Sequence, residues 1–234
     1  RLPKLAEMMI KLDGKNADPT DLANYKGVIP NPGATCDNNN TDMEDGSQSR
    51  LKSKWYLEPV GPSAMNIGYP EQEFILAEAA LRGWTEDDPE THYLNGIRAA
   101  HEFLGVSSAD TRAYLGHEKV QFKGSDTEKL GKIITEKYLN FFMQGGNEAY
   151  FELRRTGYPD FSAYLTHNTD QIYNDGYLPL RYRYPQSEID NNNAQVSEAI
   201  KRLDKGDDRN SRMWLLQGSD PLFNPAPFPF RYKN

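Results

Sequence analysis

A single cysteine, Cys36, occurs among the 234 residues of the sequence. One cysteine cannot form a disulfide within the chain or build a zinc site alone, so neither a disulfide nor a cysteine-based zinc site stabilises the fold. No apolar run approaches the roughly 20 residues that span a bilayer as a helix. Basic residues are in the minority, with 27 Lys and Arg against 34 Asp and Glu and a net charge of -7. This balance argues against nucleic acid as a partner, because a phosphate backbone requires clustered basic side chains.

Catalytic and metal-binding signatures are missing as well. No serine lies in a G-x-S-x-G elbow, and Cys36 lies in a polar loop without a neighbouring histidine. The acidic loop between residues 37 and 45 lacks the glycine placement of an EF-hand. No histidine shows HExxH spacing, which favours surface or inter-helix positions for all four: His92, His101, His117 and His167. The sequence therefore predicts no catalytic residue, no metal site and no cofactor.

The sequence does contain one strongly helical stretch, EQEFILAEAALRGW at residues 71–84. Alanine, leucine and glutamate are strong helix formers, and a helix that is apolar on nearly every face must be covered on nearly every face. Gly83 supplies the left-handed residue with which helices commonly end. We expect Trp84, directly after it, to close over the end of a helical hairpin as a core residue.

A second helix follows, and the two together have the length of a known repeat. Asp88 and Pro89 give a cap followed by proline at the first helical position. The apolar stripe of this helix consists of Tyr93, Ile97, Ala100 and Leu104. Residues 71–104 number 34, which is the period of a tetratricopeptide unit. The fold is therefore predicted to be mainly α, built on helical hairpins that need neighbours.

A second helix pair is predicted after the first. Residues 107–116 form a shorter helix capped by Ser107 or Ser108, and Ser125 with Glu128 fits a capping box. The helix that this box opens carries Leu130, Ile134, Tyr138 and Phe141 on one face and ends at Gly145 and Gly146. Residues 71–143 are expected to form two stacked helix pairs, as in repeat proteins.

The flanking segments are less regular. Residues 3–13 have the pattern of a short amphipathic helix, whereas residues 15–70 are rich in Asn, Asp, Gly and Pro and predict a long loop. Residues 147–154 continue as helix or turn, and residues 180–184 alternate in polarity, which predicts a short strand. A last helix is expected around residues 196–203, and the proline-rich tail from residue 217 is expected to be irregular.

The best candidate binding surface in the sequence is the loop at residues 24–56. A sugar presents apolar C–H faces ringed by hydroxyls, so its binders combine flat aromatic platforms with polar side chains. The loop offers such parts, and we predict as ligand-binding residues Tyr25, Trp55, Tyr56, Asp37, Asn38 and Asn39. Packing and turn chemistry are the competing interpretation of each of them. Arg154 and Arg155 could clamp an anion, but they also suit the C-terminal end of a helix.

Several long motifs, in one order, resemble the SusD/RagB-like family of outer-membrane lipoproteins. The segments YPEQEFILAEAALRGW (69–84) and YLNGIRAAHEFLGV (93–106) are similar to the central helical signature of that family. KIITEKYLNFFMQGGNEAYFELRRTGYPDF (132–161) and LPLRYRYPQSEIDNNNAQVSEAI (178–200) follow, with a closing stretch around Met213 and Trp214. The subgroup resembled carries the RRTGYP motif, and the tail at residues 218–234 departs from the family.

The resemblance implies a tetratricopeptide-rich, SusD-like single domain that covers 1–234, with parts at 1–70, 71–145 and 146–234. It also implies a lipid-anchored protein at the bacterial cell surface that captures glycans or other nutrients for a SusC-like TonB-dependent transporter. The resemblance covers roughly the C-terminal half of such a protein, so we expect the N-terminal lipid anchor to lie outside this chain. The chain begins with arginine and has no signal sequence, which fits this expectation.

Two other classes of function remain open from the sequence. A surface glycoside hydrolase or hydrolase accessory would need two carboxylates facing one bond, and with 34 acidic residues the sequence singles out no pair. A helical-repeat scaffold would bind only its protein partner. The family itself is a binding family, so the chain is predicted not to be an enzyme.

Overall fold

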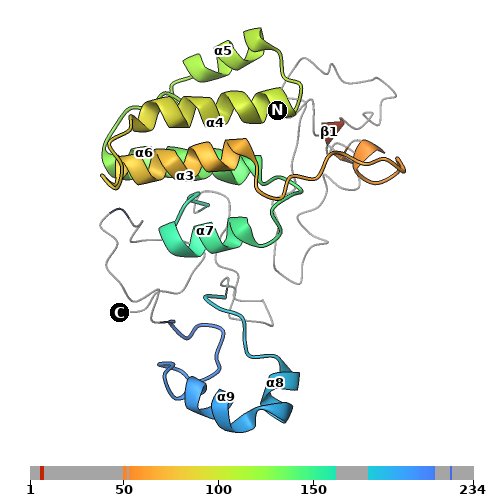
Figure 1. The fold of residues 1–234 in the computed structure, drawn as a ribbon, viewed down its shortest axis with the longest axis vertical. Coiled ribbons are helices and arrows are strands. Elements are labelled where there is room, and N and C mark those ends of the chain that lie inside the picture. Colours follow the sequence, from red (N-terminus) through yellow and green to blue (C-terminus); the bar gives the residue numbers. More distant parts are fainter. Residues whose placement is uncertain (1–5, 8–49, 52, 162–178, 214–221, 223–234) are drawn as a thin grey trace, which may run out of the picture. The chain divides into compact units, whose positions relative to one another are not determined.

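In the computed structural model the described residues are 6–7, 50–51, 53–161, 179–213 and 222. They form a mainly α-helical chain, as predicted (Figure 1). In these residues no helix is both long and apolar enough to cross a membrane. Two compact units divide between Ala149 and Tyr150, and each is described by itself below.

The first unit is organised around the hairpin of α3 (Tyr69–Leu81) and α4 (Pro89–Phe103), which lie antiparallel along each other (Figure 1). The Asp88 carboxylate caps α4 by accepting a hydrogen bond from the Thr91 backbone N–H at 3.0 Å, and Pro89 occupies the first helical position. Both features confirm the predicted start of this helix. Phe74 of α3 and Tyr93 and Ile97 of α4 are completely buried. The hairpin therefore has its own apolar seam.

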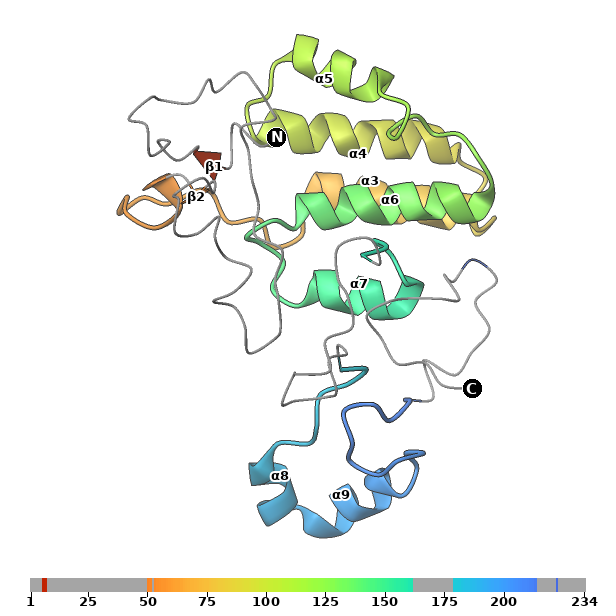
Figure 2. The same ribbon diagram turned by 180° about the vertical axis from the view of Figure 1, so that it is seen from behind.

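Two more helices complete this unit. α5 (Ser108–Gly116) is capped by Ser107, and α6 (Asp126–Asn140) opens with the predicted capping box between Ser125 and Glu128. The buried side chains Leu130, Ile133 and Ile134 lie on α6, which packs mainly along α3. Figure 2 shows α6 beside α3 from behind, with α5 on the outer side of α4. The second helix pair is thus not a copy of the first, since α6 packs against α3 rather than chiefly against α5.

Trp84 was wrongly predicted as a core residue. Its side chain is 72% exposed, and the Arg82 guanidinium lies 5.4 Å from its ring centroid. The prediction assumed that α3 is covered on nearly every face, but Ile75 is 47% exposed while Glu73 and Glu78 are buried. Those two acids are buried because each has a partner, His92 for Glu73 at 2.8 Å and Arg82 for Glu78 at 2.8 Å. Pairing, and not apolarity alone, decides which face of α3 is covered.

The N-terminal segments also differ from the prediction. Ala6–Glu7 forms a short strand, β1, which pairs antiparallel with β2 (Arg50–Leu51), so these two residues are not helical. The physical reason is the backbone pairing with residues 50–51, which the amphipathic pattern of residues 3–13 does not reveal. The rest of the predicted helix, and most of the loop at 15–70, lie outside the described residues. A turn of 3-10 helix, η2 (Ser53–Trp55), precedes an irregular segment that leads to α3.

The second unit contains α7 (Glu148–Thr156), most of which belongs to it, followed by α8 (Gln186–Asn191) and α9 (Asn193–Ile200). Leu153 of α7 packs with the buried Leu180, and Tyr150 and Phe161 flank this pair. The predicted strand at 180–184 is not present. The N–H groups of Leu180 and Arg181 both donate to the Arg209 carbonyl, at 2.8 and 3.2 Å. The segment therefore hydrogen-bonds to a loop residue and not to a neighbouring strand.

Candidate functional site

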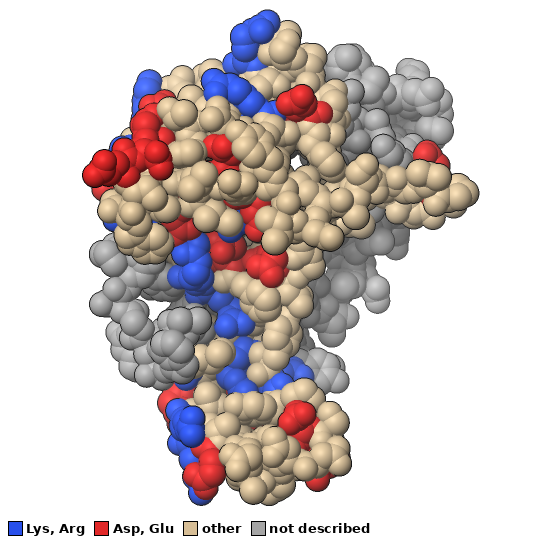
Figure 3. Space-filling model, in the orientation of Figure 1, with Lys and Arg blue, Asp and Glu red and all other residues tan. Residues whose placement is uncertain are grey.

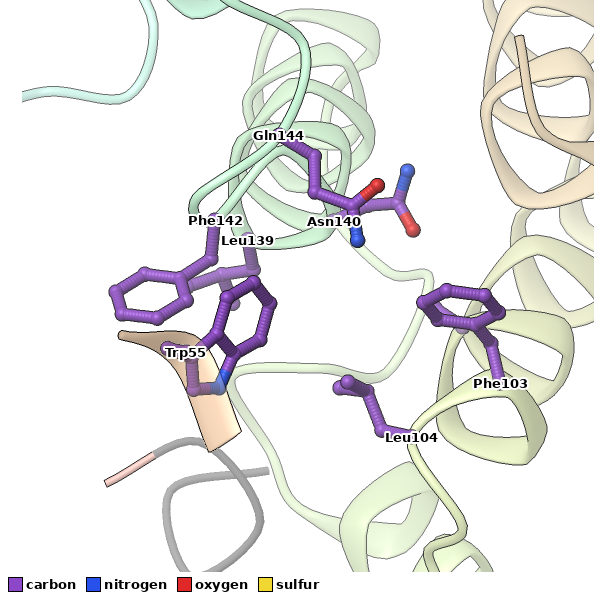
Figure 4. Close-up of a pocket in the computed structure, with 8 residues that line it drawn as sticks. Trp55, Phe103, Leu104, Leu139, Asn140, Phe142 and Gln144 are labelled. Carbon is purple, nitrogen blue, oxygen red and sulfur yellow. The ribbon is translucent and has the colours of Figure 1, made fainter. Parts of the chain in front are cut away.

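A hollow in the first unit lies where two helices end. Its wall contains Trp55 of η2, Phe103 and Leu104 at the end of α4, and Leu139 and Asn140 at the end of α6. Three further side chains line it, two from the turn after α6 and one from α4: Phe142, Gln144 and Ala100. Figure 4 shows these side chains converging from the three segments. The hollow is shallow and open: the space that it encloses is about 10 Å³, enough for roughly one water molecule, and a volume of about 300 Å³ is reached only when open solvent is included.

Trp55 is held at the hollow by contacts that are distant in sequence. Its ring meets Phe142 edge to face, with centroids 6.3 Å apart and planes at 86°. The Gln144 side chain fastens the segment that follows Trp55, because its Oε1 accepts from the Met65 N–H at 2.6 Å and its Nε2 donates to the Ser63 carbonyl at 3.4 Å. The indole is therefore positioned by the end of α6 and not by its own short helix.

The turn after α6 has an unusual backbone. Met143 has a φ of 58°, in the left-handed region that residues other than glycine rarely adopt. Its side chain is 56% exposed, and the neighbouring Phe142 ring is 42% exposed. The turn reverses the chain so that both Phe142 and Gln144 reach the wall of the hollow. Strained residues of this kind tend to occur at functional sites.

The hollow combines aromatic faces with unpaired polar groups. Within the described part of the chain, neither the Trp55 indole N–H nor the Asn140 side-chain amide has a hydrogen-bond partner. The Phe103 ring, on the opposite side, is 43% exposed. An indole N–H donates only, whereas an amide both donates and accepts. Flat rings beside such groups suit a ligand that has apolar faces and hydroxyls at its rim.

The electrostatic environment of the hollow is uncharged but acceptor-rich. Among the residues that the structure describes, no Lys, Arg, Asp or Glu lines it. α4 and α6 both reach it with their C-terminal ends, where the helix dipole carries partial negative charge. No backbone N–H of the described residues donates to the carbonyls of Leu139 and Asn140. The site therefore favours hydroxyl and N–H donors and disfavours anions.

The predicted site residues meet different outcomes. Trp55 lines the hollow, whereas Tyr56 is 55% exposed and does not belong to the wall. The other four predicted ligand residues lie outside the described residues: Tyr25, Asp37, Asn38 and Asn39. The sequence analysis gave no binding role to three residues that line the hollow: Phe103, Asn140 and Phe142. The run FFMQGG at 141–146, where two aromatic residues shortly precede a glycine pair, could have pointed to Phe142, whereas Phe103 and Asn140 have no comparable signal in the sequence.

The histidines of the hairpin are accounted for by packing. His92 Nδ1 lies 2.8 Å from Glu73 Oε2 between α4 and α3, and buried His101 Nδ1 lies 3.0 Å from Thr111 Oγ1. Burial alone would raise the pKa of Glu73, but hydrogen bonds from Tyr69 and His92 more than offset it and lower that pKa. The described residues contain no group of three or more His, Cys, Asp or Glu arranged for a metal.

Arg154 and Arg155 make contacts with neighbouring side chains on α7. Arg154 lies over the Tyr150 and Phe151 rings, 5.0 and 5.6 Å from their centroids, and Arg155 pairs with Glu152 at 2.7 Å. In Figure 3, Lys and Arg (blue) lie beside Asp and Glu (red) on the visible face of the first unit. Neither the ring contacts of Arg154 nor the ion pair of Arg155 forms an open clamp for an anion.

A buried ion pair organises the loop around Arg181. Arg181 Nη1 donates to Asp207 Oδ1 at 2.6 Å, and the Tyr184 N–H donates to the same oxygen at 3.2 Å. Burial alone would raise the pKa of Asp207, yet these hydrogen bonds and the nearby positive charges lower it. Arg181 is 5% exposed, so the ion pair stabilises the loop and is not accessible as a binding site.

Comparison with known proteins gives one consistent result. The sequence model of the SusD-like family, described as starch-binding and associating with the outer membrane, matches residues 2–185. A SusD homologue from Bacteroides fragilis NCTC 9343 is similar at 30% identity, over 92% of this chain and 48% of that one, with a TM-score of 0.81. A second SusD homologue from the same strain is 30% identical over 94% and 48%, with a TM-score of 0.77.

A chitin-binding protein is also similar, at 25% identity over 93% of this chain and 47% of that one, with a TM-score of 0.71. The comparison with curated protein sequences gives no match. This chain thus spans about half the length of the solved structures to which it is similar. The match over residues 2–185 and the shared fold place the chain in the SusD-like family.

Proposed function

We propose that the chain is part of a glycan- or nutrient-binding lipoprotein at the bacterial cell surface. It binds its ligand without cleaving it and passes it to a SusC-like TonB-dependent transporter in the outer membrane. A lipid anchor N-terminal to this chain holds the protein at the membrane. The observation that carries the proposal is the match of residues 2–185 to a family described as starch-binding and associating with the outer membrane.

The hollow adds independent support for the binding step. Trp55 and Phe103 present ring surface, and the Asn140 amide and Trp55 N–H offer unpaired hydrogen-bonding groups. Helices of the hairpin use their apolar faces on one another, so a ligand must bind at helix ends and loops, where the hollow lies. The chitin-binding relative is a protein of similar fold whose ligand is a polysaccharide.

The hydrolase alternative has less support. A glycosidase needs two carboxyl groups roughly 5–10 Å apart across one bond. The described residues that line the hollow include no carboxylate. The acids buried in the first unit are already paired, Glu73 with His92 and Glu136 with the Tyr114 hydroxyl at 2.6 Å.

The test uses the full-length, membrane-associated protein. Neutral oligosaccharides from starch, cellulose and chitin are titrated by calorimetry, and each mixture is then analysed by chromatography for shortened products. The proposal predicts binding of at least one glycan, no cleavage, and co-purification of a TonB-dependent transporter. Cleavage of any glycan would support the hydrolase alternative. A transporter that co-purifies although no glycan binds would support the scaffold.

A further inference from the structure

We propose that the outer face of α3 and the turn after it bind a positively charged, amphipathic segment of another protein. This docking surface consists of an apolar stripe and an acidic turn: Ile75, Ala79 and Trp84, followed by Glu86, Asp87, Asp88 and Glu90. It shares no residue with the hollow. The inference goes beyond the proposed function, which assigns no residue to a protein contact and does not depend on this one.

The apolar stripe lies on the side of α3 opposite to its packed side. α4 and α6 pack along α3, where Phe74 and Ala77 are completely buried. Successive residues of a helix are rotated by about 100°, so Ile75 and Ala79 lie roughly opposite to that buried pair. Ile75 is 47% exposed, and Ala79 is partly buried. An exposed apolar stripe with polar residues at its rim is typical of an interaction site.

Trp84 continues this stripe beyond the end of α3. Arg82 follows Ala79 by three residues on the same face, and the Trp84 ring lies over its guanidinium, 5.4 Å from the ring centroid. The guanidinium is held in turn by Glu78 at 2.8 Å. The Trp84 backbone N–H donates to the Ala79 carbonyl at 2.9 Å, which fixes the start of the turn. An indole that is 72% exposed is therefore already positioned, and tryptophan is a frequent anchor in protein interfaces.

The turn beside Trp84 carries charge of one sign. Residues 83–97 include four acidic residues and no Lys or Arg. In the described part of the chain, neither Glu86 nor Glu90 forms a hydrogen bond or an ion pair through its side chain. The side chain of Asp87 is 57% exposed. These carboxylates attract a cationic partner and repel an acidic one, because charges across an interface tend to be complementary.

The stripe and the turn together define the kind of partner. An amphipathic helix binds such a stripe with apolar residues at intervals of three or four. Its Lys or Arg side chains then reach the acidic turn, and one of them can lie on the outer face of the Trp84 ring as a cation–π contact. Nucleic acid and anionic membrane surfaces do not fit, since both would place negative charge beside the carboxylates.

The experiment titrates the full-length protein with two matched peptides. The first is a helical peptide of about 18 residues with Leu on one face and Lys on the other, and the second has Glu in place of every Lys. The test variants are Trp84→Ala and the double variant Glu86→Gln with Asp87→Asn. Tyr56→Ala is the aromatic control, because it removes a ring that is 55% exposed elsewhere.

A second control matches the change in charge. The double variant Glu102→Gln with Glu118→Gln removes two exposed carboxylates that lie outside the turn. It alters the net charge of the protein by the same amount as the test pair. General attraction between an acidic protein and a basic peptide would therefore respond equally to both pairs.

The Lys peptide should bind at least about tenfold more tightly than the Glu peptide. Trp84→Ala should weaken its binding about tenfold, and Glu86→Gln with Asp87→Asn about fivefold. The charge variant should also show a weaker dependence on salt than the unaltered protein. Both controls should bind as the unaltered protein does. Circular dichroism establishes that each variant is folded.

Four outcomes overturn the inference. Equal binding of the Glu peptide contradicts the charge selection, and equal losses in test and control variants show that the contact lies elsewhere. Acrylamide quenching, compared between the unaltered protein and Trp84→Phe, should show an accessible Trp84; a shielded one means that the full-length chain covers this surface itself. Sedimentation that reveals a dimer lost in Trp84→Ala assigns the surface to a second copy. All four leave the proposed function intact, because glycan titration tests that function separately.

Discussion

Gly96 of α4 packs tightly against the Phe74 ring of α3, and an alanine there should destabilise the protein. A Cβ atom built on Gly96 would lie 2.6 Å from Phe74 Cε1 and 2.9 Å from Phe74 Cδ1 and Cζ. Such distances are shorter than any ordinary contact, so the ring or the helices must move. The Phe74 ring is completely buried, which leaves it little space to do so.

Two effects of opposite sign set the magnitude. Alanine is favoured over glycine inside a helix by about 1 kcal/mol, which alone would stabilise the Gly96→Ala variant. Overpacking a filled core costs roughly 1–3 kcal/mol. The clash should exceed the helical gain, so we expect a net loss of up to about 2 kcal/mol in the free energy of unfolding.

Gly116 offers a matched control. It is the last residue of α5, and nothing lies within 4 Å of a Cβ built on it. Gly116→Ala should therefore be neutral or slightly stabilising. Urea denaturation followed by circular dichroism measures both variants, and Phe74→Leu combined with Gly96→Ala should recover part of the loss, because the ring is then absent. A Gly96→Ala variant as stable as Gly116→Ala would refute the close packing of α3 against α4.

Three further predictions concern single side chains. Met143→Gly should raise the unfolding free energy by roughly 1 kcal/mol in the same urea assay, because it relieves a left-handed backbone while losing little burial; a decrease would show that the Met143 side chain supports the fold. Trp84→Ala should change the unfolding free energy by less than about 1 kcal/mol, since only an exposed contact with Arg82 is lost. A loss above about 3 kcal/mol would show that the Trp84 side chain is buried in the core. Asp207→Asn should cost about 3–5 kcal/mol, because Arg181 then remains buried without its counter-charge, and a thermal melt at neutral pH checks this. The pKa of Asp207 is lowered from 3.8, so its contribution to the free energy of unfolding is full above that pH and is lost as the pH falls through the lower folded value. Acid should therefore lower the Tm of the unaltered protein more than the Tm of Asp207→Asn, and equal decreases would contradict the assignment.

The parts of the fold that sequence predicted correctly depend on neighbouring residues. The Asp88 cap, the Ser107 cap and the capping box of Ser125 and Glu128 are all satisfied within one turn of the residues that form them. Local hydrogen bonds of this kind are fixed by spacing alone. The starts of α4, α5 and α6 could therefore be read from the sequence.

The errors arose where distant partners decide the outcome. The burial of Glu73 depends on His92, 19 residues along the chain, and Ile75 and Trp84 are exposed instead. Apolar content along α3 does not reveal which face receives α6. The alternation at 180–184 likewise predicts a strand, but a strand also requires a neighbouring strand, and the backbone there bonds to Arg209.

The candidate site was predictable only in part. An aromatic residue in a polar loop identified Trp55, but its contact with Phe142 joins residues 87 positions apart and has no local signature. Asn140 and Phe103 lie together because the C-terminal ends of α6 and α4 converge, and this depends on the packing of α6 against the hairpin. Four of the predicted residues lie outside the described residues and stay predictions.

The most direct measurement of the central claim is a crystal structure of the full-length protein with the tightest-binding neutral pentasaccharide. The account predicts a sugar ring against the surface of the hollow, with its C–H face on Trp55 or Phe103 and a hydroxyl within hydrogen-bond distance of the Asn140 amide. A glycan bound with no ring at these residues, or a hollow filled by another part of the protein, would contradict it.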